Sequence, residues 1–221
     1  MRMRKKKHLE ERLAQGAQNN IFVYRSDNLK FTDTDQKEFI DIEGYFGRKA
    51  PLHMEVGCGK GGFMLQLAAL HPEINYIAVE YCANVIVTAA ENALKAGLKN
   101  VLFVNADAGY LQRLIPEKSV DLIYLNFSCP FPKNKYAAHR LTHARFLEIY
   151  RSLMTEGAAI YQKTDNRPFF DFSVGQFEQC GFKLSNITYD LANSGYEGNI
   201  MTEYERRFTS MGVPICRLEA I

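Results

Sequence analysis

Short apolar runs alternate with amphipathic stretches along most of the chain, beginning at Pro51. Five of the runs have the length and composition of buried strands, and they cover residues 52–56, 74–80, 101–106, 120–127 and 158–163. Stretches with helical character lie between them, at residues 63–70, 83–96, 142–154 and 169–180. Near-continuous apolar strands separated by amphipathic helices are typical of a parallel sheet with helices on both faces. The pattern therefore predicts an α/β fold built on a doubly wound, mostly parallel sheet.

The pattern changes at both ends of the chain. No helix is expected after Gly181, because residues 182–191 and 204–208 have the pattern of strands and residues 214–220 that of a strand or a tail. A terminal hairpin of this kind would add an antiparallel edge to the sheet, which doubly wound folds tolerate. Residues 31–46 are mixed and acidic without a clear period, which predicts a connecting segment. We therefore expect an N-terminal arm and connecting segment over residues 1–49, and one folded domain over residues 50–221.

Charge and composition limit the partners that the chain can have. Of the 221 residues, 47% are hydrophobic, which is enough for one full core. The formal net charge is only +2, so any nucleic-acid surface must come from local clusters of basic residues. One cluster lies in the N-terminal arm and consists of Arg2, Arg4, Lys5, Lys6, Lys7 and Arg12. Such an arm is either a solvated terminus or a contact for phosphate groups, and the sequence leaves both open.

Cysteine spacing and the absence of long apolar runs predict the setting of the protein. The five cysteines are odd in number and form no C-x-x-C pair, which argues against a disulfide framework and a structural zinc site. No stretch is apolar enough to span a bilayer or to act as a secretory signal. The sequence therefore predicts a cytoplasmic protein with no membrane association and no metal, as a monomer or a homodimer.

A glycine-rich segment directly follows the first predicted strand. Residues 55–63 read Glu-Val-Gly-Cys-Gly-Lys-Gly-Gly-Phe and lead into a predicted helix, whose free N–H groups favour a polar ligand. The segment lacks the G-K-[ST] ending of a phosphate-binding loop. Gly57, Gly59 and Gly62 do satisfy the dinucleotide pattern G-x-G-x-x-G, so an NAD-type ligand stays possible on this motif alone. The acid at Glu55 favours S-adenosylmethionine, because a carboxylate would attract its cationic methionine end and repel a pyrophosphate.

Two further acids follow the next two predicted strands. Glu80 ends the second strand and Asp107 follows the third. Polar side chains at the carboxyl ends of parallel strands project into one crevice, where such folds bind nucleotides. We therefore predict Glu55, Gly57, Gly59, Glu80 and Asp107 as the residues that bind the cofactor.

The segment after the fourth predicted strand is stiff, aromatic and basic. Residues 126–133 read Asn-Phe-Ser-Cys-Pro-Phe-Pro-Lys. The two prolines hold such a loop extended, and the rings and the lysine suit recognition of a nucleic-acid base. A packed crossover loop would explain the prolines equally well.

In these and other segments the chain resembles the bacterial tRNA (guanine-N7) methyltransferases. The resemblance runs through most of the chain and is carried by the segments EVGCGKG (55–61), NYIAVE (75–80), LNFS (125–128), KTDNR (163–167) and EGNIMTEYE (197–205). It implies a Rossmann-like methyltransferase fold over residues 50–221, and transfer of a methyl group from S-adenosylmethionine to N7 of a guanine in the variable region of tRNA. By position, it also implies substrate-side roles for Lys133, Asp165, Thr202 and Glu205.

The chain departs from the family pattern in the loop after LNFS. The family has Asp-Pro-Trp-Pro-Lys and then a dense basic run, whereas this chain has Cys129, Phe131 and fewer basic residues. Guanine N7 already carries a free lone pair, so catalysis consists mainly of alignment, helped by a carboxylate that stabilises the positive charge of the product. Losing such a carboxylate would cost roughly 2–4 kcal/mol. Cys129 and Asp165 are therefore the predicted catalytic positions, with Asp165 able to compensate.

Three interpretations of the function follow from this departure. The first is an active tRNA guanine-N7 methyltransferase with an altered loop. The second is a non-catalytic or weakly active relative that binds S-adenosylmethionine, RNA or both, because Cys129 replaces the loop aspartate. The third is a methyltransferase for another acceptor, against which the retained substrate-side residues argue.

Overall fold

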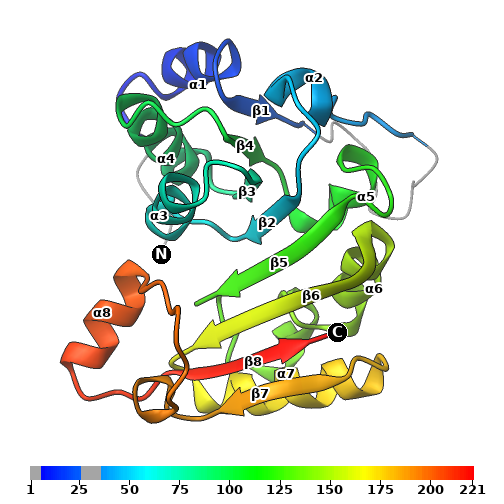
Figure 1. Ribbon diagram of the computed structural model, residues 1–221, viewed down its shortest axis with the longest axis vertical. Helices are drawn as coiled ribbons and strands as arrows, with labels where there is room; N and C mark the ends of the chain where they lie inside the picture. Colours follow the sequence, from blue (N-terminus) through cyan, green and yellow to red (C-terminus); the bar gives the residue numbers. More distant parts are fainter. Residues whose placement is uncertain (1–5, 26–35) are drawn as a thin grey trace. The chain divides into compact units, whose positions relative to one another are not determined.

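The computed structural model describes residues 6–25 and 36–221, and the chain divides into two compact units, residues 1–116 and 117–221 (Figure 1). The first unit contains the glycine-rich segment, and the second contains the loop with Cys129. The functional boundary expected between residues 49 and 50 remains a prediction. Arg2, Arg4 and Lys5 of the predicted arm, and residues 31–35 of the predicted connecting segment, lie outside the described residues.

The described part of the first unit is built on four parallel strands. They are β1 (Ile21–Val23), β2 (Leu52–Val56), β3 (Asn75–Val79) and β4 (Val101–Asn105), in the order β1-β4-β3-β2. All five residues of β3 are buried, as expected for a central strand covered on both faces. The strands predicted at residues 52–56, 74–80 and 101–106 are thus confirmed. The sequence pattern missed β1, which has only three residues and lies within the predicted arm.

Helices surround these strands in the first unit. They are α1 (Leu9–Ala17), α2 (Ile42–Phe46), α3 (Gly62–Leu70), α4 (Ala83–Lys95) and α5 (Leu111–Leu114), with the 3-10 turn η1 (Ala108–Tyr110) before α5. α4 packs on β4, and α1 packs in turn on α4 and β1. The carboxylate of Glu91 on α4 accepts hydrogen bonds from Nε and Nη2 of Arg12, at 2.6 and 2.7 Å. The described part of the arm is therefore folded against α4, and α2 lies in what was expected to be a connecting segment.

The second unit contains both parallel and antiparallel strands. β5 (Val120–Asn126) and β6 (Met154–Thr164) are parallel, whereas β8 (Cys216–Ala220) runs antiparallel to β6 and to β7 (Leu184–Thr188). The order is β5-β6-β8-β7, so the last strand of the chain lies between β6 and β7. The antiparallel C-terminal strands predicted from the sequence are confirmed, and residues 214–220 contain a strand.

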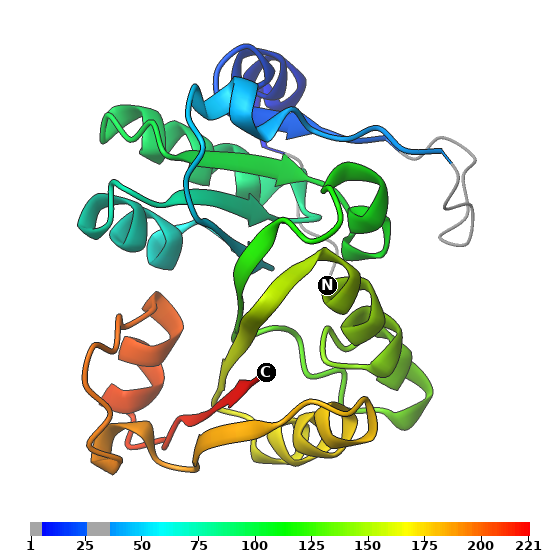
Figure 2. The same ribbon diagram turned by 45° about the vertical axis from the view of Figure 1, so that its right-hand side comes forward.

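Three helices and two short turns complete the second unit. They are α6 (Ala144–Leu153), α7 (Arg167–Gln179) and α8 (Glu203–Ser210), with the 3-10 turns η2 (Asn134–His139) and η3 (Leu191–Asn193). α7 runs along β6, β8 and β7 and also contacts α6 (Figure 2). No helix in the described ranges, residues 6–25 and 36–221, has the length and apolar character to cross a membrane.

The strand predicted at residues 204–208, and the prediction that no helix follows Gly181, are both wrong. This segment is the helix α8, and it begins with a capping box. Thr202 Oγ1 accepts the N–H of Glu205 at 2.9 Å, and the Glu205 carboxylate accepts the N–H of Thr202 at 3.4 Å. Tyr204 and Phe208 are four residues apart, so their rings lie on one face of the helix, about one turn from each other.

Candidate active site

The glycine-rich segment forms a tight turn between β2 and α3. Gly57, Gly59 and Gly61 have φ angles of +85°, +57° and +79°, in the left-handed region that glycine adopts without steric cost. The N–H groups of Gly57 and Cys58 both donate to the carbonyl oxygen of Val79, at 2.9 and 3.0 Å. The turn is therefore fastened to the end of β3.

The surroundings of Gly61 and Gly59 differ in the space that they leave for a side chain. A Cβ at Gly61 would lie 2.9 Å from the Cβ of Ala89, so this position is closed by packing against α4. A Cβ at Gly59 would meet no atom within 4 Å, so the backbone of Gly59 faces open space. An accessible turn beside a helix N-terminus is suited to a polar ligand.

The carboxylate of Glu80 ties this turn to the start of α4. Oε2 accepts the N–H of Gly59 at 3.1 Å, and Oε1 accepts the N–H of Cys82 at 2.8 Å. The side-chain amide of Asn105 holds the main-chain oxygen of Glu80 at 2.8 Å. Each carboxylate oxygen has a second lone pair, so a fixed Glu80 can still accept hydrogen bonds from ribose hydroxyl groups.

Acidic groups come from the ends of three neighbouring strands in this unit. Glu55 lies in β2 and is 2% exposed, Glu80 follows β3, and Asp107 follows β4. Asp107 is fixed by accepting the N–H of Gly109 at 2.8 Å. Burial raises the pKa of the Cys58 thiol well above its ordinary value, and the negative charges of Glu55 and Glu80 raise it further. This negative potential fits a cationic ligand that also presents hydroxyl groups, as S-adenosylmethionine does.

The loop that carries Cys129 has an unusual backbone. Phe127 and Phe131 have φ angles of +49° and +41°, which costs about 1–2 kcal/mol for a residue with a side chain. Arg140 holds the loop by donating to the carbonyl oxygens of Pro130 at 2.9 Å and Phe131 at 3.0 Å. Its guanidinium also lies 4.2 Å from the ring centroid of Phe172. Cys129 itself is exposed.

The structure gives Arg140 a role that the sequence did not predict. Arg140 is only 8% exposed, and it organises the loop. Lys133 and Lys135 are exposed, and Lys135 lies 5.0 Å from the ring centroid of Tyr136.

The substrate-side residues predicted in the second unit fall into two environments. Lys133 is exposed and precedes η2, and Asp165 is half-buried between the end of β6 and the start of α7. Cys129 and Asp165 follow the carboxyl ends of the neighbouring parallel strands β5 and β6. Thr202 and Glu205 are instead buried, at 5% and 2% exposed, and they form the capping box of α8.

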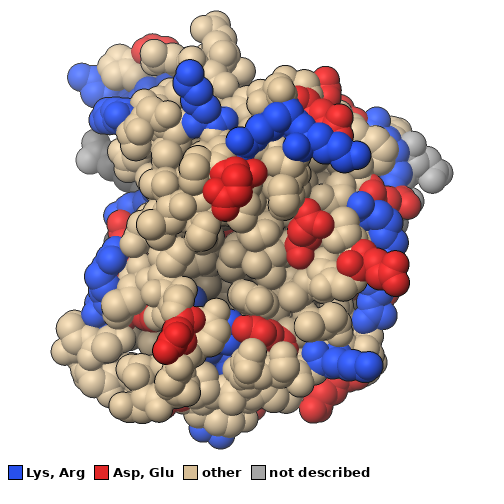
Figure 3. Space-filling view, in the orientation of Figure 1, with Lys and Arg blue, Asp and Glu red and all other residues tan. Residues whose placement is uncertain are grey.

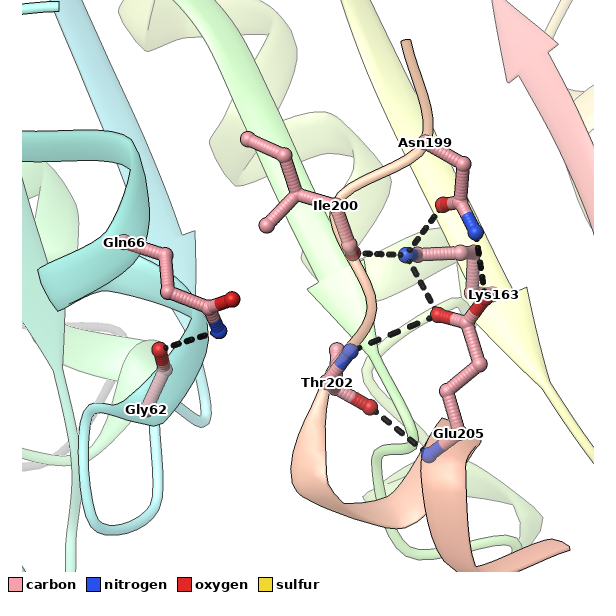
Figure 4. A network of polar contacts seen from close by, with 7 residues as sticks. All are labelled: Gly62, Gln66, Lys163, Asn199, Ile200, Thr202 and Glu205. Atoms are coloured by element: carbon pink, nitrogen blue, oxygen red, sulfur yellow. Dashed lines mark hydrogen bonds and ion pairs between the residues drawn. The ribbon is translucent and has the colours of Figure 1, made fainter. Parts of the chain in front are cut away.

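A buried lysine of β6, which the sequence analysis did not single out, connects this strand to the start of α8 (Figure 4). Nζ of Lys163 donates to Oε2 of Glu205 at 2.8 Å, to Oδ1 of Asn199 at 3.0 Å and to the carbonyl oxygen of Ile200 at 2.9 Å. The amide of Asn199 also donates to Oε1 of Glu205. The spacing T-x-x-E at residues 202–205 is a capping-box signature and could have revealed the helix. Nothing in the sequence pattern reveals that Lys163 is the counter-ion of Glu205.

Comparisons with known proteins agree with this geometry. A family model described as "Putative methyltransferase" matches residues 49–218. The tRNA (guanine-N(7)-)-methyltransferase of Streptococcus thermophilus strain CNRZ 1066 is 39% identical over 220 residues, which cover 100% of this chain and 98% of the relative. The enzyme of the same name from Listeria monocytogenes serotype 4b is 44% identical over 175 residues, covering 79% of this chain and 82% of the relative.

Two solved structures with similar folds are methyltransferases of lower sequence identity. The 16S rRNA methyltransferase KamB has a TM-score of 0.60 at 19% identity, covering 83% of this chain and 93% of its own. A SAM-dependent methyltransferase from Aquifex aeolicus has a TM-score of 0.56 at 14% identity, covering 97% of this chain and 98% of its own. These similarities confirm the Rossmann-like methyltransferase fold, and the full-length relatives show that the chain belongs to the tRNA (guanine-N(7)-)-methyltransferase family.

Proposed function

We propose that this protein transfers a methyl group from S-adenosylmethionine to N7 of a guanine in the variable region of tRNA, and that it does so in the cytoplasm. The observation that carries the proposal is the turn after β2, which is lined by glycines and acidic side chains. The chain that contains this turn belongs to the tRNA (guanine-N(7)-)-methyltransferase family. Glu55, Glu80 and Asp107 follow one another on adjacent strands, and the open backbone at Gly59 leaves room for the ligand.

The residues of the first unit would bind and orient the cofactor, which supplies an activated methyl group on a sulfonium ion. The negative charge of Glu55 would attract the cationic methionine end. The fixed carboxylate of Glu80 would accept hydrogen bonds from the ribose hydroxyl groups, and Asp107 would border the adenine. Gly57 and Gly59 would let the ligand approach the main chain closely.

The residues of the second unit would hold the guanine. N7 needs no base to remove a proton, so the protein has to align it with the methyl group. Asp165 is half-buried and would accept hydrogen bonds from the guanine N1–H and amino groups, stabilising the positive charge that methylation creates. Lys133 would contact a phosphate. Cys129 would border the acceptor as a neutral side chain, with Thr202 and Glu205 shaping the other side.

Binding of tRNA would depend on local groups instead of net charge. Lys and Arg side chains are interspersed with acidic ones on the face drawn in Figure 3, in keeping with a net charge of +2. Each phosphate contact contributes about one unit to the slope of log affinity against log salt concentration. With few such contacts, we expect the affinity for tRNA to fall only gradually as the salt concentration rises.

The direct test is methyl transfer from labelled S-adenosylmethionine to tRNA that lacks the N7 methyl group. Cys129→Asp would be assayed alongside, with Asn134→Asp as a matched control, since it adds the same charge at an exposed position at the start of η2. We expect the unaltered protein to methylate one guanine and Cys129→Asp to be faster by roughly 30- to 1000-fold, as expected for a carboxylate worth about 2–4 kcal/mol. Asn134→Asp should not accelerate the reaction.

The other outcomes separate the competing interpretations. No transfer by the unaltered protein, with transfer restored by Cys129→Asp, would establish a relative that lost catalysis at one carboxylate. No transfer to tRNA by either protein, with cofactor binding intact in a calorimeter, would overturn the proposed acceptor and leave a methyltransferase of another substrate.

A further inference from the structure

Three aromatic rings of the second unit lie beside the loop that carries Cys129. The ring centroids of Phe127, Tyr204 and Phe208 are 6.0, 6.2 and 6.4 Å apart, and their planes are tilted by only 16–22° from one another. Three nearly parallel rings stacked in one column would place the outer two about twice as far apart as neighbours. The nearly equal distances instead mean that the rings are laid out like overlapping tiles.

Tyr204 is the exposed member of this aromatic platform. It is 55% exposed, whereas Phe127 and Phe208 are half-buried. A ring that is about half exposed can still be contacted by a planar group of a ligand. Phe127 belongs to the same loop as Cys129, two residues before it, so the platform begins where the proposed acceptor residues begin.

The two halves of the platform are held by one residue, Lys163. Its main-chain oxygen accepts the N–H of Phe127 at 2.8 Å, which fixes that residue in its left-handed conformation. Its side-chain nitrogen donates to Glu205, the neighbour of Tyr204 on α8. Strained backbone of this kind persists only where the surroundings determine it and is concentrated at functional sites.

We propose that Tyr204, supported by Phe127 and Phe208, is a stacking surface for the purine that accepts the methyl group. This inference rests on the proposed function and adds a positioning residue to it. Unpaired RNA bases are bound by stacking on aromatic side chains, and every base offers a π-face for this contact. A ring beneath the purine would fix its plane, which alignment of N7 requires.

The test compares three substitutions of Tyr204 that differ in one property each. Tyr204→Phe keeps the ring and loses the hydroxyl, Tyr204→Leu keeps a large apolar side chain without a π-face, and Tyr204→Ala removes both. Met211→Ala is the matched control, because Met211 is an exposed apolar side chain at the end of the same helix. Rates of methyl transfer to tRNA, affinity for S-adenosylmethionine and thermal unfolding would be measured for all four.

We expect Tyr204→Phe and Met211→Ala to stay near the unaltered protein. Tyr204→Leu and Tyr204→Ala should lose roughly 5- to 150-fold in kcat/KM for tRNA, as stacking on one base predicts. Cofactor affinity and thermal unfolding should not change. Wild-type activity in Tyr204→Leu would overturn the platform while leaving the proposed function intact. Equal losses in Tyr204→Phe and Tyr204→Leu would also overturn it, because the hydroxyl and not the ring would then matter. If the unaltered protein itself fails to methylate tRNA, the proposed function fails, and the platform as inferred fails with it.

Discussion

Replacing Glu205 by glutamine would leave the ammonium group of Lys163 buried without its counter-charge. The two side chains are 7% and 3% exposed, and their charged atoms are 2.8 Å apart. Removing one partner of a buried ion pair costs about 3–5 kcal/mol, because the remaining charge keeps its desolvation penalty. Glutamine can still accept from Lys163 and Thr202 through its oxygen, but its amide group would then face the donor Asn199 Nδ2.

We therefore expect Glu205→Gln to lower the free energy of unfolding by about 3 kcal/mol or more. For a chain of this size that corresponds to a fall in Tm of roughly 6–12 °C. The measurement is urea unfolding at pH 7 followed by far-UV circular dichroism, because the chain contains no tryptophan to report by fluorescence.

Glu203→Gln is the matched control for this change. It removes the same charge from the first turn of the same helix, but Glu203 is exposed, so its loss should cost less than about 1 kcal/mol. Combining Lys163→Met with Glu205→Gln should recover about 1–3 kcal/mol relative to the sum of the single variants, since no buried charge remains. A cost for Glu205→Gln equal to that of Glu203→Gln would refute the argument that the pair is a buried, coupled unit.

Two further predictions concern the first unit. Gly61→Ala should lower the free energy of unfolding by about 1–2 kcal/mol and weaken binding of S-adenosylmethionine in a calorimeter, because φ is +79° and the new Cβ would lie 2.9 Å from the Cβ of Ala89. The control Gly175→Ala lies in the interior of α7, where a Cβ meets nothing within 4 Å, and should instead stabilise the fold by about 0.5–1 kcal/mol. Equal effects of the two substitutions would contradict this reasoning. The hydrogen bond from Arg12 lowers the pKa of Glu91 below its ordinary value of 4.5, so the pair stabilises the fold above that pH and the contribution is lost as the pH falls through the lowered pKa. The stability difference between the unaltered protein and Glu91→Gln should therefore be present in urea titrations at pH 7, at most about 1 kcal/mol for this partly exposed pair, and shrink below pH 4.5. A difference that stays undiminished as the pH falls to 3 would argue against the ion pair. The exposed control Glu156→Gln should show no such difference.

The parts of the fold that follow from the sequence are those with a strong local pattern. The buried strands β2, β3 and β4 are nearly continuous apolar runs, and the turn after β2 requires glycine where φ is positive. These elements depend on residues that are close together in the sequence, so the sequence alone is enough to predict them. The acids that follow these strands were located for the same reason, because parallel topology places the carboxyl ends of strands at one edge.

The missed elements depend on contacts between distant residues. β1 has three residues and is defined by pairing with β4, about 80 positions later in the chain. In α8, Tyr204 and Phe208 would share one face of a strand as well as one face of a helix, so their spacing does not distinguish the two. The capping box and the ion pair to Lys163 determine the helix. The burial of Arg140 could not be predicted either, since its partners are carbonyl oxygens and carry no signature in the sequence.

The loop around residue 129 keeps its shape through contacts that do not involve the side chain at that position. Arg140 holds two of its carbonyl oxygens, the main chain of Lys163 holds Phe127, and two prolines restrict the rest. Cys129 is exposed, so an aspartate there would neither fill a cavity nor break a buried contact. Exchange of cysteine and aspartate at this position is therefore expected to cost little folding free energy. Under the proposed function, its effect is on the charge beside the acceptor guanine. For that reason Cys129→Asp should alter the rate of methyl transfer without altering unfolding stability, and a large change in stability would show that the side chain at residue 129 helps to hold the loop.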